Sequence, residues 1–286
     1  MTVPAPSPAD FPPAPALVAA LYRFARFDDP EGLRAPLHDL CAVQGVRGTL
    51  LLATEGINGT IAGPEAGIAA VIAHIRALPG CSGLDVKYAS APAIPFGRLK
   101  VKVKAEIVTL GVGDLDPAAN AGTHVAPRNW NALIADPETV VIDTRNSYEV
   151  DIGSFEGAID PDTQGFRDFP ARFDAMAAQW AQEGRTPRIA MFCTGGIRCE
   201  KSTAYARSRG FGEVYHLEGG ILRYLEEVAE DESLWRGECF VFDERVAVGP
   251  GLALGTYVSC EACGVPVARS AFADHHCSAS APDGVD

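Results

Sequence analysis

Cys193 and Arg198 are the side chains whose types and spacing point most directly to chemistry. Cys193 follows the apolar run Ile189–Phe192, which is typical of a buried strand, and it precedes the helix-competent stretch Glu200–Arg207. A thiol at such a junction faces free backbone N–H groups and the positive end of the helix dipole. These surroundings lower a thiol pKa from about 8.5 into the range of roughly 3.5–7.5. The sequence therefore predicts a reactive thiolate held in an anion-binding loop.

The length of this loop restricts the size of the anion that it can hold. Four residues separate Cys193 from Arg198, whereas five separate the same residue types in Cys-dependent phosphatases. The shorter loop suits a persulfide or another small anion on sulfur better than a phosphate. Arg198 adds a fixed positive charge beside the sulfur, and glycine allows backbone N–H groups to turn inward. The predicted loop consists of Thr194, Gly195, Gly196 and Ile197.

A structural cysteine followed by a glycine turn is the alternative interpretation of this segment. The joint occurrence of strand, loop, two glycines, arginine and helix favours the functional interpretation.

Cys199 is either a resolving thiol for Cys193 or a packed residue at the start of the helix. Asp143 and Arg145 lie at a strand end near the site. They either take part in the site or form a structural ion pair or loop brace, and we expect the structural role. Glu218 is either a hydrogen-bond acceptor near the pocket or a turn residue.

Composition limits the partners and the compartment. The chain of 286 residues has a formal charge of −13, so an RNA partner requires a local basic patch. Its eight cysteines lack the density of a secreted disulfide scaffold, which favours the cytoplasm. Residues 1–16 are rich in Pro and Ala without a signal-peptide pattern, so we expect a disordered leader there. Apolar runs of about 18 residues are missing from the sequence, so we expect no membrane partner.

The segment 17–112 alternates between strand and helix patterns. Strand-like alternation occurs at Leu21–Phe27, and an amphipathic helix is expected over Pro64–Leu78. Asn58-Gly59 is a signal for a tight turn, and Lys100–Leu110 has the pattern of a long strand. The order β-α-β-β-α-β predicts a ferredoxin-like (acylphosphatase-like) α+β domain.

Lysines alternate with apolar residues at the start of that last strand. Lys100, Lys102 and Lys104 would share one face of the strand. Together with Lys87 and Arg98 they form a basic concentration in an acidic chain. We expect them to contact RNA phosphates. A solvated sheet face, or an edge protected by lysines, is the alternative.

A second α/β unit follows a polar linker over residues 111–126. Short apolar strands alternate with helices over 127–232, which predicts a parallel sheet. Ligands of such sheets gather at the carboxyl ends of the strands, and the final segment 233–286 is rich in loops. The expected strands are Val140–Asp143, Ile189–Phe192 and Val214–Leu217, and the expected helices are Pro170–Gln182, Glu200–Ser208 and Ile221–Glu230.

A cysteine pair near the C-terminus has the spacing of a zinc knuckle. Cys260 and Cys263 form Cys-x-x-Cys, and His275, His276 and Cys277 follow at a workable distance. A second Cys-x-x-Cys pair is missing, because the chain continues as His-His-Cys-Ser-Ala-Ser. Zinc therefore stays an alternative here, and the sequence assigns no metal ligands.

Several motifs together resemble one protein family. Residues 143–159 resemble the entry motif of a rhodanese domain, and Leu217–Ile221 resembles its closing motif. From about Leu17 to Cys263, the chain is similar to the TrhO/YceA family of rhodanese-domain-containing tRNA uridine(34) hydroxylases. The motifs that carry this similarity are EGINGT at Glu55–Thr60, RLKVK at Arg98–Lys102, CTGGIRCEKS at Cys193–Ser202 and GECFVFDERVAV at Gly237–Val248.

This resemblance implies a reaction and a site. The implied reaction is the oxygen-dependent formation of 5-hydroxyuridine at the tRNA wobble position, by an oxidoreductase with molecular oxygen as co-substrate. Cys193 is then the active-site cysteine with a persulfide intermediate, and Arg198 stabilises its anionic form. The implied partners are tRNA and a sulfur donor or acceptor protein.

The residues by themselves indicate a different reaction. A flavin fingerprint, a haem motif and a two-His-one-carboxylate iron set are not recognisable in the sequence. The alternative function is therefore a persulfide-carrying sulfurtransferase that acts on a small thiol or a protein acceptor. A non-catalytic docking module is a third possibility, and the intact Cys193 argues against it.

Overall fold

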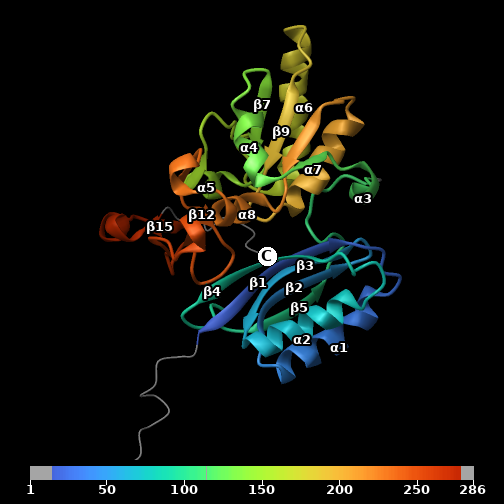
Figure 1. Ribbon diagram of the computed structural model, residues 1–286, viewed down its shortest axis with the longest axis vertical. Coiled ribbons are helices and arrows are strands. Elements are labelled where there is room, and N and C mark those ends of the chain that lie inside the picture. The colour runs from blue at the N-terminus through green and yellow to red at the C-terminus, as the bar shows by residue number, and fades with distance from the viewer. Residues whose placement is uncertain (1–14, 114, 278–286) are drawn as a thin grey trace, which may run out of the picture.

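The chain folds into two α/β lobes with a smaller C-terminal segment at their side (Figure 1). The computed structural model describes residues 15–113 and 115–277. The predicted leader therefore lies outside the described residues up to position 14, as do the last residues of the predicted C-terminal extension. Among the described residues, no helix is long and apolar enough to cross a membrane.

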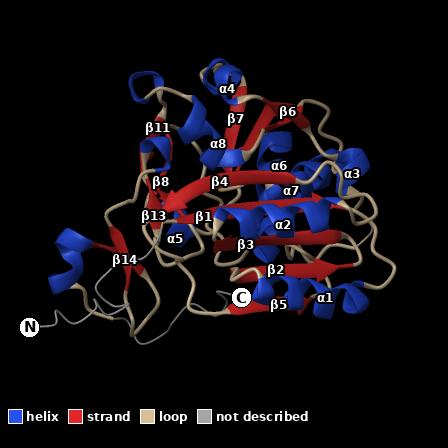
Figure 2. Cartoon of the chain, turned by 60° about the horizontal axis from the view of Figure 1, so that its bottom comes forward, coloured by secondary structure: helices blue, strands red, loops and turns tan. Residues whose placement is uncertain are grey.

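The N-terminal lobe is a five-stranded sheet with two helices on one face (Figure 2). The strand order β4-β1-β3-β2-β5 contains the antiparallel β4-β1-β3-β2 arrangement of a ferredoxin-like unit, to which β5 adds in parallel beside β2. The predicted fold of this lobe is therefore confirmed. Its elements are β1 (Ala16–Phe24), α1 (Pro30–Val43), β2 (Arg47–Ala53), β3 (Gly56–Gly63), α2 (Glu65–Arg76), β4 (Asp85–Ala91) and β5 (Leu99–Val103).

Local chemistry explains where the helices lie in this lobe. Asp29 caps α1 by accepting the Gly32 N–H at 2.9 Å, and Pro30 occupies the first helical position. In α2, Ile68, Val71, Ile72 and Ile75 form one buried face. They pack on alternate strand residues such as Leu50 and Ile61. The opposite face of the sheet is turned toward the second lobe (Figure 1).

Two local predictions for this lobe were wrong. Asn58-Gly59 lies within β3, and the chain reverses at Thr54-Glu55 instead. Gly59 is needed inside the strand because a Cβ there would lie 2.0 Å from the Thr49 carbonyl oxygen. The last strand ends at Val103, although the Lys104 N–H still donates to the Leu52 carbonyl oxygen at 2.9 Å. The chain then leaves the sheet, and the Glu106 carboxylate accepts the Leu110 N–H at 3.1 Å.

The second lobe contains a four-stranded parallel sheet with helices on both faces. In the central strand β9, Ala190 and Phe192 pack with α4 and α8, whereas Ile189 and Met191 pack with α6 and α7. The elements are α3 (Pro117–Asn120), β6 (Thr123–Val125), α4 (Pro127–Ile134), β7 (Thr139–Asp143), α5 (Ser147–Val150), α6 (Phe169–Gln182), β9 (Arg188–Phe192), α7 (Ile197–Ser208), β10 (Val214–Leu217) and α8 (Gly220–Glu227).

The predicted linker over 111–126 is partly structured. It contains α3 and the edge strand β6, which pairs in parallel with β10. The sequence missed this strand because it is only three residues long and largely exposed. Its pairing with β10, rather than its own apolar pattern, makes it a strand.

The C-terminal segment consists of three small antiparallel pairs. The first pair joins this segment to the second lobe, and the last pair projects from the body (Figure 1). The pairs are β8 (Gly153–Phe155) with β11 (Trp235–Gly237), β12 (Cys239–Phe240) with β13 (Ala247–Val248), and β14 (Tyr257–Ser259) with β15 (Pro266–Ala268).

Candidate active site

Cys193 lies at the carboxyl end of β9, in the loop that leads into α7. Its side chain is fully buried. Gly196 caps α7 with a φ of +97°, a conformation that favours glycine, and its N–H donates to Cys193 Sγ at 3.1 Å. Within the predicted loop, the Gly196 N–H therefore points at the sulfur.

The surroundings of Cys193 favour its thiolate form. Burial by itself would raise the pKa of this thiol. The Cys199 thiol as a hydrogen-bond donor, the Arg198 charge and the backbone N–H groups of Cys199 and Gly196 outweigh burial, and lower the pKa of Cys193 to about 6. The sulfur is therefore mostly ionised at neutral pH.

Cys199 occupies the third position of α7, next to the Cys193 sulfur. It is fully buried, and Thr144 Oγ1 lies 3.7 Å from its Sγ. Burial and the neighbouring Cys193 raise the pKa of Cys199 well above the ordinary value. Cys199 is thus protonated and serves as a donor to Cys193. The resolving role stays a prediction.

Arg198 is held by a partner that the sequence analysis did not identify. Its Nη1 and Nη2 donate to Oε2 and Oε1 of Glu149 at 2.6 and 2.7 Å, and Nη2 lies 3.4 Å from Thr194 Oγ1. Glu149 belongs to α5 and is fully buried. The Asn146–Glu149 spacing of a capping box was the available signal for this helix start. The positive charge of Arg198 therefore stabilises the Cys193 thiolate, whereas the hydrogen bonds of its guanidinium go to Glu149.

Asp143 and Arg145 form the structural ion pair that the sequence predicts. Both side chains are fully buried, and Arg145 Nη2 and Nε donate to the Asp143 carboxylate at 2.6 and 2.9 Å. Arg145 also donates to the carbonyl oxygens of Glu149 and Gly153 at 3.2 and 2.6 Å. The pair fixes α5 and β8 beside the cysteine loop.

The start of α8 holds the loop from the other side. The Ile221 and Leu222 N–H groups donate to the carbonyl oxygens of Cys193 and Thr194 at 3.0 and 3.1 Å. A Cβ on Gly220 would lie 2.5 Å from the Cys193 oxygen, so this approach requires glycine. The adjacent Glu218 pairs with Arg223 at 2.6 Å and is therefore a turn residue outside the sulfur's contacts.

The N-terminal lobe also contacts the cysteine loop. Lys87 Nζ donates to the Gly195 carbonyl oxygen at 2.7 Å, pairs with Asp85, and lies 4.7 Å from the centre of the Tyr22 ring. Tyr22 in turn donates to Glu200 Oε1 at 3.0 Å. Lys87 is buried against the cysteine loop, so it does not share an exposed basic surface with the lysines of β5.

Two histidines and a carboxylate meet where the lobes join. His124 on β6, His216 on β10 and Glu200 on α7 bring their ligand atoms within 4.8 Å of one another. His124 Nε2 and Glu200 Oε1 are 3.0 Å apart. The sequence showed no such group because its members come from three separate elements. Since Glu200 also accepts from Tyr22, the group joins the network between the lobes.

Comparison with known proteins covers both lobes. Residues 16–107 match the UPF0176 acylphosphatase-like domain, and residues 127–227 match the rhodanese-like domain. A protein of Jannaschia sp. (strain CCS1) named tRNA uridine(34) hydroxylase is 62% identical over 258 residues, which are 90% of this chain and 84% of the relative. The chain belongs to the tRNA uridine(34) hydroxylase family.

Further members of the family show the same extent of similarity. The Mesorhizobium japonicum protein of that name is 61% identical over 91% of this chain and 82% of the relative. The Caulobacter vibrioides protein is 61% identical over 87% of this chain and 80% of the relative. The family resemblance found in the sequence motifs is confirmed.

Proposed function

We propose that this protein is an oxygen-dependent tRNA uridine(34) hydroxylase that forms 5-hydroxyuridine at the wobble position, with Cys193 as its active-site residue. The observation that carries the proposal is the 62% identity, over 90% of the chain, to a protein of that name. The low pKa of Cys193, about 6, supports a reactive sulfur at the centre of the site. A cytoplasmic location accords with this substrate.

The site residues would act on the sulfur and its charge. Cys193 provides a thiolate, or a persulfide formed when that thiolate takes the outer sulfur atom of a sulfane-sulfur donor such as thiosulfate, which leaves as sulfite. The Gly196 N–H, the Cys199 thiol and the Arg198 charge stabilise that anion. Glu149 keeps Arg198 in place through two short hydrogen bonds. In a monooxygenase-type reaction, one atom of molecular oxygen is added to the base. The other atom is reduced to water by two electrons from an external reductant together with two protons.

Strand register connects the predicted RNA-binding lysines to the active site. Directly paired residues of neighbouring strands point to the same face of a sheet. Lys100 and Lys102 therefore share a face with Tyr22 and Lys87, which touch α7 and the cysteine loop. The row of Lys102 passes through Leu51, Asn58 and Tyr22 to Asp85, and the row of Lys100 passes through Thr49, Thr60 and Ala20 to Lys87.

This row gives a path for bound RNA. Lys102 and Tyr22 are three strand spacings apart, or about 14 Å. Lys104 is exposed just beyond β5 and extends the row of lysines. We infer that phosphates on Lys100, Lys102 and Lys104 hold tRNA while the target base approaches the lobe junction. Because Cys193 is fully buried, side chains around the loop must move before a base reaches the sulfur.

Charge reversal on this face tests the RNA contact. We expect Lys100→Glu with Lys102→Glu to weaken tRNA binding about tenfold or more, and to reduce the slope of log affinity against log salt by about 1–2. Filter binding at several salt concentrations measures both quantities. Arg34→Glu with Arg76→Glu makes the same charge change on the helix-covered side and should change binding little. If both double variants lose the same tRNA affinity, the effect comes from the net charge of the protein and the lysines of β5 are not the RNA contact.

Nucleoside analysis tests the proposed function itself. A strain that lacks this protein and any other route to wobble 5-hydroxyuridine should regain the nucleoside, detected by mass spectrometry of its tRNA, when the wild-type chain is supplied. Growth without oxygen should abolish the recovery. Unchanged tRNA, together with sulfur transfer from thiosulfate to cyanide by the purified protein, would favour the sulfurtransferase instead.

A further inference from the structure

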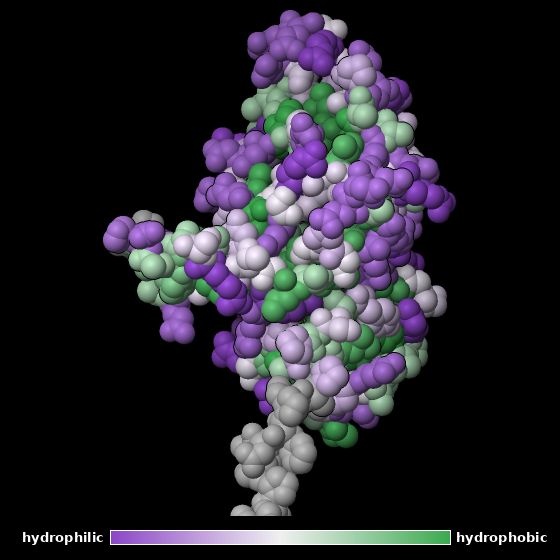
Figure 3. Space-filling view, turned by 60° about the vertical axis from the view of Figure 1, so that its left-hand side comes forward, coloured by the Kyte–Doolittle hydropathy of each residue, from purple (hydrophilic) through white to green (hydrophobic). Residues whose placement is uncertain are grey.

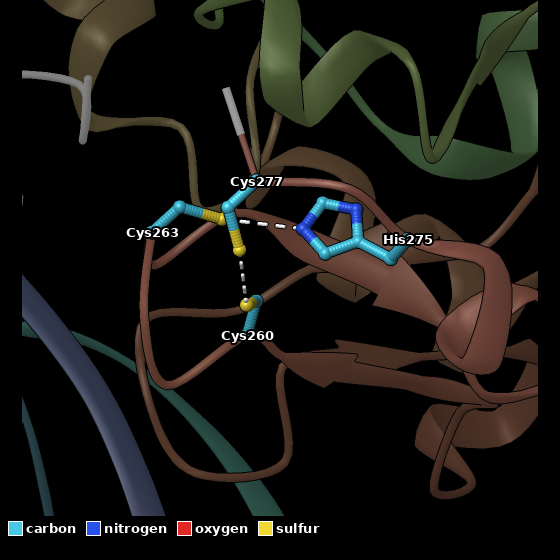
Figure 4. A group of neighbouring side chains, drawn as sticks. All are labelled: Cys260, Cys263, His275 and Cys277. Atoms are coloured by element: carbon cyan, nitrogen blue, oxygen red, sulfur yellow. Dashed lines mark hydrogen bonds between the residues drawn. The ribbon is translucent and has the colours of Figure 1, made fainter. Parts of the chain in front are cut away.

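The C-terminal hairpin gathers three cysteines and a histidine around one point. Cys260 and Cys263 flank the turn between β14 and β15, and His275 and Cys277 return to them after the 3-10 helix Arg269–Asp274 (Figure 4). The four ligand atoms lie within 4.8 Å of one another. The chain thus brings together residues that the sequence left unassigned.

The spacing of these atoms fits a tetrahedral metal ion. Zn–S bonds of about 2.3 Å and Zn–N bonds of about 2.0–2.1 Å place tetrahedral neighbours roughly 3.5–3.8 Å apart. Cys260 Sγ and Cys277 Sγ are 3.5 Å apart, and Cys263 Sγ is 3.3 Å from His275 Nε2. Three sulfurs and one imidazole nitrogen are a ligand set typical of structural zinc.

The hairpin has little else to hold it together. Its core consists of Cys260, Cys263 and Val267, with Val265 packed against them. Each strand has only three residues, and an isolated two-stranded hairpin is marginal in water. The segment also stands out from the body of the protein (Figures 1 and 3). A small unit without an adequate core commonly depends on a metal or on disulfides.

The backbone of the turn is shaped for two sulfur ligands. The Gly264 N–H donates to the Cys260 carbonyl oxygen at 2.8 Å, and the Cys260 N–H donates to the Val265 oxygen at 2.9 Å. Gly264 has a φ of +72°, which closes the turn tightly. The two cysteine side chains therefore face the same side as His275 and Cys277 (Figure 4).

We propose that Cys260, Cys263, His275 and Cys277 bind one Zn²⁺ as a structural site. Four protein ligands leave no open coordination position, so the ion does no chemistry on a substrate. Each thiol gives up its proton on binding. The missing second Cys-x-x-Cys pair is replaced by His-x-Cys, which supplies one nitrogen and one sulfur instead of two sulfurs.

The site would stabilise a segment that adjoins the active site. Thr256 N and Oγ1 donate to the Glu238 carboxylate at 2.9 and 2.7 Å. Tyr257 packs on the cluster that contains Phe240. Tyr148 packs on the same cluster and belongs to the same short helix as Glu149. Zinc would thus fix the hairpin against the elements beside Glu149.

Metal analysis of the full-length protein tests this site. Protein purified without a metal-affinity tag should contain about one zinc per chain by inductively coupled plasma mass spectrometry. His275→Ala and Cys260→Ser should each lose most of it. His276→Ala alters the adjacent histidine, which is not among the clustered ligands, and should keep its zinc. Zinc near background in the wild type, or equal loss in His275→Ala and His276→Ala, would overturn the proposal.

A disulfide is the main competing explanation for the short Cys260–Cys277 distance. Intact mass under denaturing, non-reducing conditions separates the two, because a disulfide lowers the mass by two hydrogens. We expect free thiols together with bound zinc, and a Cys260–Cys277 disulfide in freshly purified protein would contradict the site. Chelation should also speed trypsin cleavage at Arg269 roughly tenfold, because the hairpin opens more often. Unchanged cleavage of protein shown to have lost its zinc would contradict the structural role.

Discussion

Cys193→Ala is expected to abolish the hydroxylation of tRNA while leaving the chain folded. The sulfur is the reactive atom of the proposed site, and no other described cysteine lies at the end of a parallel strand facing a helix start. The smaller side chain leaves a gap that costs about 1 kcal/mol or more of folding stability, far less than is needed to unfold a domain. The measurement is wobble 5-hydroxyuridine in tRNA, beside a urea unfolding curve of the variant.

A buried but inert thiol provides the control. Cys41 is fully buried in the N-terminal core, and burial raises its pKa to about 11. Cys41→Ala removes the same atom at a similar packing cost and should keep most of the activity. If Cys193→Ala remains active, or if both variants fail equally, Cys193 is not the reactive residue.

The ionisation of Cys193 gives an independent readout of the same prediction. Its alkylation by iodoacetamide, followed peptide by peptide by mass spectrometry, should increase with pH and reach half its maximal rate at about pH 6. Cys41 should stay unreactive until much higher pH. A midpoint near the ordinary thiol pKa of about 8.5 would show that the loop does not stabilise the anion.

Glu149→Ala is expected to cause the largest loss of stability, about 3–5 kcal/mol. The substitution leaves the Arg198 guanidinium buried without the carboxylate that accepts its two short hydrogen bonds. Activity should be lost as well, because Arg198 is then free to move away from Cys193. Urea unfolding monitored by tryptophan fluorescence measures the stability, and nucleoside analysis measures the activity.

A double variant separates the loss of the pair from the stranded charge. Glu149→Leu with Arg198→Met replaces both partners with apolar residues of similar size, and it should recover much of the lost stability but no activity. If the double variant is less stable than Glu149→Ala, the stranded charge is not the cause.

The same pair predicts a dependence of stability on pH. Burial raises the pKa of Glu149. The charge and hydrogen bonds of Arg198, the charge of Arg145 and the Asn146 backbone N–H outweigh burial and hold that pKa below its usual range. A carboxyl group whose pKa is lower in the folded than in the unfolded chain adds to the free energy of unfolding. This contribution is fully present at pH values above the pKa of the unfolded chain, about 4.3. That contribution is lost as the pH falls through the lowered pKa, and it is missing at every pH in Glu149→Ala.

Local patterns in the sequence were sufficient for many elements of the fold. The apolar run that ends at Phe192 predicted β9, and the apolar face of 64–78 predicted α2. In a helix that buries one face, apolar residues recur with the period of the helix, and a short unbroken apolar run is typical of a buried strand. Local patterns gave wrong predictions where contacts with neighbouring strands decide the backbone conformation. Asn58-Gly59 favours a turn in isolation, yet close packing against Thr49 keeps Gly59 within β3.

The sequence by itself determined the centre of this protein: a cysteine between strand and helix, a loop of four residues, and the motifs of one family. These features depend on residues adjacent in the chain, so they can be recognised without coordinates. Only the tertiary structure decided what surrounds the sulfur. Glu149 reaches Arg198 from 49 positions away, and Lys87 reaches Gly195 from 108. Such contacts depend on how separate elements pack together, and this packing cannot be predicted from the spacing of residues along the chain.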